Sequence, residues 1–103
     1  MNHSKAIRDK IPEIIEKSGH SCKIRTLNDE KFLLEIRKKL SEEVKEYNDS
    51  YEITELADIL EVVYRIAQLQ GISKEELEKI RIKKLQDRGG FDKNLFLIDT
   101  SES

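Results

Sequence analysis

The sequence has a single cysteine and no tryptophan, and aromatic residues make up only 6% of its 103 residues. Cys22 has no second cysteine for an internal disulfide, and neither it nor the two histidines has a companion at a metal-binding spacing. No apolar run is long enough for a signal peptide or a membrane span. These absences argue against a disulfide scaffold and a zinc site, and they predict a cytoplasmic protein without a membrane partner.

A marked excess of charge of one sign is also missing, although 39% of the residues are charged. The 19 basic and 21 acidic residues give a net charge of only −2. Because no strong global field follows from this balance, we expect no nucleic-acid polymer as a partner, and anions must be bound locally. The length predicts one domain, residues 1–103, with a thin core and a flexible end from about residue 99.

Apolar residues recur at helical spacing through most of the chain. The pattern predicts a short N-terminal helix and three longer ones, over residues 12–18, 30–47, 53–70 and 74–87. The sequence Asn48-Asp49-Ser50 is typical of a turn, so the two long helices should form an antiparallel hairpin. Ser73 and Glu76 have the capping-box spacing that begins the last helix. The predicted fold class is therefore all-α, a hairpin with a third helix and a short N-terminal helix.

The predicted helix over residues 53–70 carries two apolar stripes. One stripe comprises Ile53, Leu56, Ala57, Leu60, Val63, Tyr64 and Ala67, and the other comprises Ile59, Val62, Ile66 and Leu69. A helix with two apolar sides must be covered from two directions, and one short chain offers little surface for this. We expect a second copy to cover the second stripe, in a homodimer or homotetramer. The alternative is that the N-terminal helix and the C-terminal tail cover it.

Acidic residues gather on both sides of the predicted turn, with Glu42, Glu43 and Glu46 before it and Glu55 and Asp58 after it. Residues three apart share a helix surface, so Glu43 pairs with Glu46, and Glu55 with Asp58, in like-charged pairs that repel. A helical wheel places Glu43 about 60° from the centre of the apolar stripe and Glu42 nearly opposite it. These carboxylates are either ordinary solvated side chains or ligands of Mg²⁺ or Mn²⁺, which prefer oxygen donors.

Basic residues continue the apolar stripe of the last predicted helix. Arg81, Lys84 and Arg88 lie on the same side as Leu77 and Ile80, so the stripe becomes basic toward its C-terminal end. They are candidates for binding phosphate. The alternative is that long basic side chains lie at the core edge and favour a helix C-terminus.

The pattern E-E-x-x-E followed by E-x-x-D across a helical hairpin is similar to the signature of the all-α nucleoside-triphosphate pyrophosphohydrolases. That superfamily includes MazG, dimeric dUTPases and phosphoribosyl-ATP pyrophosphohydrolase. Three further segments resemble a small, single-domain, MazG-like branch of it: residues 7–15, residues 55–62, and Arg88-Gly-Gly-Phe91 followed by Phe96-Leu97. The resemblance covers nearly the whole chain.

The resemblance implies four metal ligands: Glu43, Glu46, Glu55 and Asp58. It makes Glu43 a catalytic residue as well as a ligand, and it makes Glu42 a weaker candidate for positioning the attacking water. It also adds Arg8 and Lys10 to the candidates for binding substrate. The implied cofactor is Mg²⁺. Four carboxylates exceed what one Mg²⁺ usually takes from protein, so the site holds either one ion or a second that arrives with the substrate. The implied reaction hydrolyses a nucleoside triphosphate to a nucleoside monophosphate and pyrophosphate.

One departure from the family pattern is the short connection between the acidic pairs. Only eight residues separate Glu46 from Glu55, fewer than in many members, which could restrict the substrate pocket. Two other functions remain open, a non-catalytic helical interaction module and a phosphoribosyl-ATP pyrophosphohydrolase. The retained acidic set argues against the first, and the Arg-Asp-Lys head with the Arg-Gly-Gly-Phe tail is unlike the usual pattern of the second.

Overall fold

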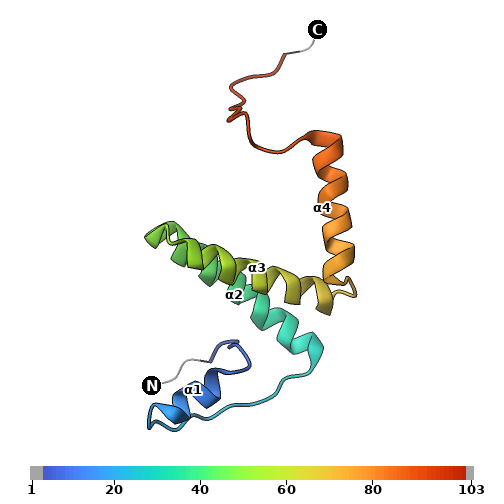
Figure 1. Ribbon diagram of the computed structural model, residues 1–103. Coiled ribbons are helices and arrows are strands. Elements are labelled where there is room, and N and C mark those ends of the chain that lie inside the picture. Colours follow the sequence, from blue (N-terminus) through green and yellow to red (C-terminus); the bar gives the residue numbers. More distant parts are fainter. Residues whose placement is uncertain (1–3, 102–103) are drawn as a thin grey trace.

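A computed structural model describes residues 4–101 and is helical wherever it has regular structure (Figure 1). Its helices are α1 (Ile11–Lys17), α2 (Asp29–Ser50), α3 (Ile53–Leu69) and α4 (Lys74–Arg88). The absence of strands from this range confirms the all-α class. None of these helices is long and apolar enough to cross a membrane. Residues 102–103 of the predicted flexible end lie outside the described residues.

Helices α2 and α3 lie side by side and run in opposite directions, which confirms the predicted hairpin (Figure 1). Asn28 caps α2, because its side-chain oxygen accepts a hydrogen bond from the Lys31 N–H at 2.8 Å. Tyr51 ends α2 in the left-handed conformation with φ 57°, and its N–H donates to the Tyr47 carbonyl at 2.7 Å. The chain reverses there and α3 begins at Ile53.

The predicted turn at residues 48–50 is wrong, because α2 continues through Ser50. Lys45 Nζ lies 3.0 Å from Asp49 Oδ2, an ion pair that stabilises the last turn of the helix. The Ser50 hydroxyl accepts a hydrogen bond from the Glu52 N–H at 3.1 Å. Side chains that often form turns are used here to finish a helix, and the reversal falls on the next two residues.

A small core lies between α2 and α3, beneath the segment that precedes α1. Ile36 of α2, Val62 of α3 and Ala6 of the N-terminal segment form its buried cluster. Partly buried residues pack around them: Phe32, Leu33, Leu40, Ile66 and Leu69. The N-terminal segment is therefore fixed to the hairpin at Ala6, even though it has no regular secondary structure.

Except at Ala67, which is buried, the two apolar stripes of α3 are covered in the opposite way to the prediction. Val62, Ile66 and Leu69 of the second stripe pack against α2, so this stripe needs no second copy. Leu56 and Leu60 of the first stripe are 41% and 50% exposed. Periodicity shows that α3 has two apolar sides, but the direction in which the chain leaves the turn decides which side faces α2.

Helix α4 turns away from the hairpin, at the end opposite the Tyr51 turn, and contacts only α3 among the helices (Figure 1). The predicted capping box is present, with the Ser73 hydroxyl accepting from the Glu76 N–H at 3.1 Å. No residue of α4 is buried. The Cα radius of gyration is 18.3 Å. A compact domain of this length would have about 13 Å, so the single chain is extended.

Candidate metal centre

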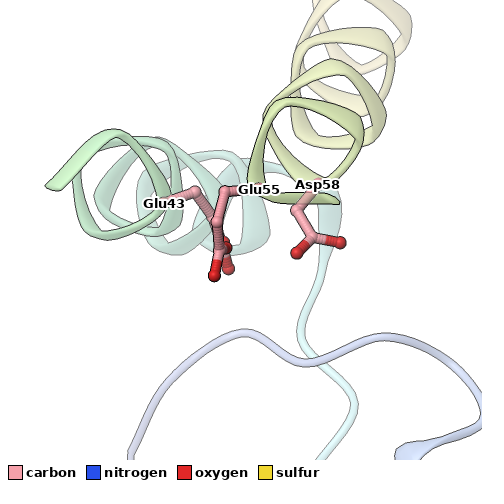
Figure 2. Close-up of side chains that lie close together, drawn as sticks. All are labelled: Glu43, Glu55 and Asp58. Atoms are coloured by element: carbon pink, nitrogen blue, oxygen red, sulfur yellow. The ribbon is translucent and has the colours of Figure 1, made fainter. Parts of the chain in front are cut away.

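Three of the predicted ligands meet on one side of the hairpin. They are Glu43 of α2 and, one helical turn apart on α3, Glu55 and Asp58. One carboxylate oxygen from each lies within 4.8 Å of the others. Their side chains point in the same direction, toward the N-terminal segment (Figure 2). We call these three residues the carboxylate cluster.

The packing of α3 explains why its two carboxylates face α2. Residues separated by three, four and seven positions return to one helix surface, so Glu55 and Asp58 share a face with Val62. Val62 lies in the core against α2. The same face, continued toward the start of α3, therefore presents both carboxylates to the part of α2 that carries Glu43.

Glu43 is the buried member of the cluster, with only 6% of its surface exposed. Its Oε1 lies 3.3 Å from Lys39 Nζ, whereas its Oε2 is buried and has no hydrogen-bond partner among the described residues. Burial raises the pKa of the Glu43 carboxyl; Lys39 opposes this effect and the neighbouring Glu46 adds to it. A buried carboxylate with an unpaired oxygen is costly, and a bound cation would satisfy it.

The donor set fits a hard divalent cation. The cluster offers carboxylate oxygens and no nitrogen or sulfur, which suits Mg²⁺ or Mn²⁺ better than zinc. Glu46, the fourth predicted ligand, is exposed and lies outside the three-residue cluster. It is nevertheless near enough to Glu43 to help raise the pKa of that carboxyl.

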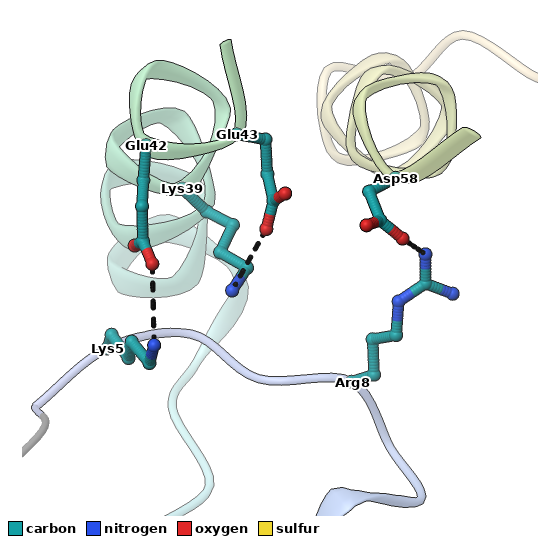
Figure 3. A network of polar contacts seen from close by, with 6 residues as sticks. All are labelled: Lys5, Arg8, Lys39, Glu42, Glu43 and Asp58. Carbon is teal, nitrogen blue, oxygen red and sulfur yellow. Dashed lines mark hydrogen bonds and ion pairs between the residues drawn. The ribbon is translucent and has the colours of Figure 1, made fainter. Parts of the chain in front are cut away.

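Basic side chains pair with Glu43 and Asp58 of the cluster and with the neighbouring Glu42 (Figure 3). The pairs are Lys39 Nζ–Glu43 Oε1 at 3.3 Å, Arg8 Nη2–Asp58 Oδ1 at 2.6 Å and Lys5 Nζ–Glu42 Oε1 at 3.3 Å. Sequence reasoning selected Arg8 but missed Lys39 and Lys5. Lys39 could have been found, because it precedes Glu43 by four residues, the spacing of a helix ion pair. The position of Lys5 follows only from the path of the chain.

Glu42 does not face open solvent as the helical wheel predicted. Its side chain is 37% exposed and pairs with Lys5. The N-terminal segment crosses this side of α2, which a wheel drawn for one helix cannot show. Glu42 thus lies beside the cluster rather than away from it, although it is not one of the three converging carboxylates.

The basic residues of α4 do not reach the cluster within one chain. All three candidates are exposed: Arg81, Lys84 and Arg88. Arg81 lines a concave angle between α3 and α4 together with Leu60, which lies about 160° around α3 from Asp58. Arg81 also pairs with Glu78, which raises the pKa of Arg81 and lowers that of Glu78. Arg81 shares this angle with Leu77, the side that helical spacing predicted, but α4 turns away from the hairpin, so the angle lies apart from the carboxylate cluster.

The two basic candidates from the head of the chain have different positions. Arg8 reaches Asp58 across 50 residues of sequence. Lys10 is exposed and lies at the N-terminal boundary of α1. The head therefore contributes Arg8, and not Lys10, to the surroundings of the cluster in this structure.

Comparison of the chain with protein-family models, with curated proteins and with solved structures found no match. The fold and the site define an all-helical chain whose helical hairpin carries a cluster of carboxylates. The resemblance to the all-α nucleoside-triphosphate pyrophosphohydrolases rests on the motifs of the sequence itself and stays a prediction.

Proposed function

We propose that this protein is a divalent-metal-dependent hydrolase that cleaves nucleoside triphosphates between the α- and β-phosphates. The products are a nucleoside monophosphate and pyrophosphate. The observation that carries the proposal is the convergence of Glu43, Glu55 and Asp58, with the unpaired buried oxygen of Glu43 among them. The family resemblance of the acidic motif supplies the reaction class.

In this proposal Glu43, Glu55 and Asp58 hold Mg²⁺, which Mn²⁺ can replace, and Glu46 adds a carboxylate from the solvent side. When bound, the ion neutralises phosphate charge and increases the acidity of water. Glu42 orients the attacking water and accepts its proton at a carboxylate oxygen. A bond forms between the water oxygen and the α-phosphorus, while the bond from that phosphorus to the bridging oxygen breaks and pyrophosphate leaves.

We also propose that the working form is a homodimer or homotetramer. Leu60 is half exposed, and Phe91 and Phe96 are 97% and 88% exposed. Leaving such side chains in water forfeits roughly 1.5–3 kcal/mol each. A second copy packed on the first stripe of α3 would cover this apolar surface. It would also give Arg81 and its basic neighbours on α4 a route to the carboxylate cluster of the other copy.

The exposed apolar face also suits the alternative of a non-catalytic interaction module. The carboxylate cluster favours the enzyme instead, because a scaffold gains nothing from a buried carboxylate oxygen without a partner. A phosphoribosyl-ATP pyrophosphohydrolase would use the same chemistry and differs only in its substrate. The substrate panel below separates these functions.

The test is a panel of canonical and damaged nucleoside triphosphates, with phosphoribosyl-ATP included, incubated with the protein and Mg²⁺. We expect pyrophosphate release from at least one nucleoside triphosphate and loss of turnover when EDTA removes the metal. Preference for a damaged nucleotide would support a house-cleaning role in the cytoplasmic nucleotide pool. Orthophosphate as the sole product, or no turnover on the whole panel, would rule the proposal out.

A further inference from the structure

The N-terminal segment crosses the hairpin on the side to which the carboxylates point (Figure 3). Ala6 fixes the segment, since it is 7% exposed and packs in the core with Ile36 and Val62. On one side of Ala6, Lys5 reaches Glu42 of α2, and on the other side Arg8 reaches Asp58 of α3. The segment therefore bridges both helices of the hairpin beside the cluster.

Two of the three clustered carboxylates pair with basic side chains that differ in exposure and in the kind of segment that carries them. Lys39 is part of α2, its side chain is only 17% exposed, and it pairs with buried Glu43. The side chain of Arg8 is 56% exposed and leaves a segment without regular structure. Lys39 is consequently fixed beside Glu43, whereas Arg8 can leave Asp58 without disturbing the core at Ala6.

Arg8 and a metal ion compete for the same carboxylate. The guanidinium Nη2 lies 2.6 Å from Asp58 Oδ1, so a divalent cation ligated by Asp58 would stand close to a second positive charge. An incoming cation must therefore displace Arg8 or bind against its repulsion. A displaced guanidinium would still be tethered beside the cluster, because Ala6 holds the N-terminal segment in the core.

We propose that Arg8 is an exchanging counter-ion, which occupies Asp58 in the metal-free protein and transfers to a phosphate of the bound nucleotide. The inference rests on the proposed function and deepens it, since it names Asp58 as the partner that Arg8 holds before substrate arrives. A planar guanidinium suits both partners, because it donates paired hydrogen bonds to carboxylate and to phosphate. Metal binding at Asp58 frees Arg8 for the phosphate, and phosphate binding draws Arg8 away from Asp58. Each ligand therefore increases the affinity of the protein for the other.

The proposal predicts opposite signs for two affinities in the Arg8→Gln variant of the full chain. Without any anion, Mn²⁺ should bind about threefold more tightly, because an exposed competing ion pair is gone. Binding of inorganic pyrophosphate to the Mn²⁺-saturated protein should weaken at least about tenfold, because a charge-assisted hydrogen-bond donor is gone. Electron paramagnetic resonance of free Mn²⁺ gives the first affinity, and calorimetry gives the second.

Two further variants separate this mechanism from simpler ones. Lys5→Gln removes one positive charge from the same segment but leaves Asp58 untouched, so Mn²⁺ affinity should change less than in Arg8→Gln. Arg8→Lys keeps the charge without the planar fork, so Mn²⁺ affinity should stay near wild type while pyrophosphate binds more weakly. Circular dichroism of each variant shows that the helices are retained.

The outcomes distinguish failure of this inference from failure of the proposed function. If the wild-type protein does not bind Mn²⁺ at all, both fail together. If it binds Mn²⁺ and releases pyrophosphate from nucleotides, but Arg8→Gln changes both affinities in the same direction or neither, only the exchange by Arg8 is overturned. If Lys5→Gln raises Mn²⁺ affinity as much as Arg8→Gln does, the effect comes from the net charge of the segment alone. That result would also overturn the exchange by Arg8.

Discussion

The hairpin region, which comprises residues 4–10 with α2 and α3, differs from the C-terminal region, which comprises α4 and residues 89–101. Both are rich in charged residues, but only the hairpin region contains buried residues. In the C-terminal region Glu78 pairs with Arg81, and Asp87 with Lys83, one turn away on the same helix. In the hairpin region Arg8 pairs with Asp58 across 50 residues.

This difference shows what turns acidic residues into a site. An exposed carboxylate on α4 is paired with a local basic side chain or solvated by water, so neighbouring carboxylates are not held close to it. The carboxylates of the hairpin are brought together because packing at Val62 fixes one face of α3 against α2. Burial then leaves the Oε2 atom of Glu43 without a hydrogen-bond partner among the described residues. Acidic residues therefore form a candidate metal site only where tertiary packing holds their side chains together.

The largest expected effect follows from placing a charge in the hairpin core. Val62→Glu should unfold the chain or lower its free energy of unfolding by about 3 kcal/mol or more, because it buries an unpaired carboxylate. Thermal melting followed by circular dichroism measures this. Leu60→Glu, on the half-exposed stripe, is the matched control and should lose much less stability than Val62→Glu, because its carboxylate stays in solvent in the single chain. Retained stability in Val62→Glu would contradict the assignment of Val62 to the core of one chain.

The second effect concerns turnover and separates the cluster from its neighbour Glu42. Asp58→Asn and Glu43→Gln should each lower kcat by about 100-fold or more with the helices intact, because they remove groups that hold the metal. Glu42→Gln should cost less, since Glu42 lies beside the cluster. Steady-state kinetics with Mg²⁺ measures all three. Equal losses of kcat from Glu42→Gln and Glu43→Gln would contradict the distinction between the metal-holding cluster and the neighbouring Glu42.

The third prediction concerns the apolar surface shared by α3 and the C-terminal region. The wild-type protein should be at least a dimer at micromolar concentration, and Leu60→Glu should dissociate it to a monomer that is still folded. Light scattering gives the mass, and melting gives the stability. A wild-type protein that is monomeric and fully active in dilute solution would remove the role proposed for a second copy.

The smallest effect is a dependence of stability on pH in the metal-free protein. Burial raises the pKa of Glu43 above its ordinary value of 4.5, so the folded state holds this proton more tightly than the unfolded state. The associated stability is complete below pH 4.5 and is lost as pH rises through the raised pKa. Denaturant titrations across this range should show a steeper loss in wild type than in Glu43→Gln. Parallel curves for the two proteins would contradict the burial argument.

Most of the secondary structure could be predicted because its causes are local. Helical periodicity identified the two long helices, Pro12 and Gly19 marked the short N-terminal one, and the Ser73 capping box marked the start of the last. The Asn28 cap likewise depends on residues close in sequence. The turn failed because Asn48, Asp49 and Ser50 suit a helix end as well as a turn. The choice between these depends on where the whole helix pair reverses, which is not a local property.

The candidate site could be predicted only in part, for the same reason. The three-residue spacing of Glu55 and Asp58 predicted that they share a helix face, and the helical wheel predicted that Glu43 lies near the core. The contacts of Lys5 and Arg8 depend on the path of a segment without regular structure, so only the structure reveals them. The departure of α4 from the hairpin is likewise tertiary, and it places Arg81 in the angle between α3 and α4 rather than beside the cluster.

The most direct test of the account is a titration of Mn²⁺ into three proteins: wild type, Asp58→Asn and Glu75→Gln. Asp58 belongs to the carboxylate cluster, whereas Glu75 is an exposed acidic residue of α4. The account predicts saturable binding to wild type, at least about tenfold weaker binding to Asp58→Asn, and no change in Glu75→Gln. Absence of saturable binding to wild type, or equal weakening by the two substitutions, would contradict the claim that the hairpin holds a metal.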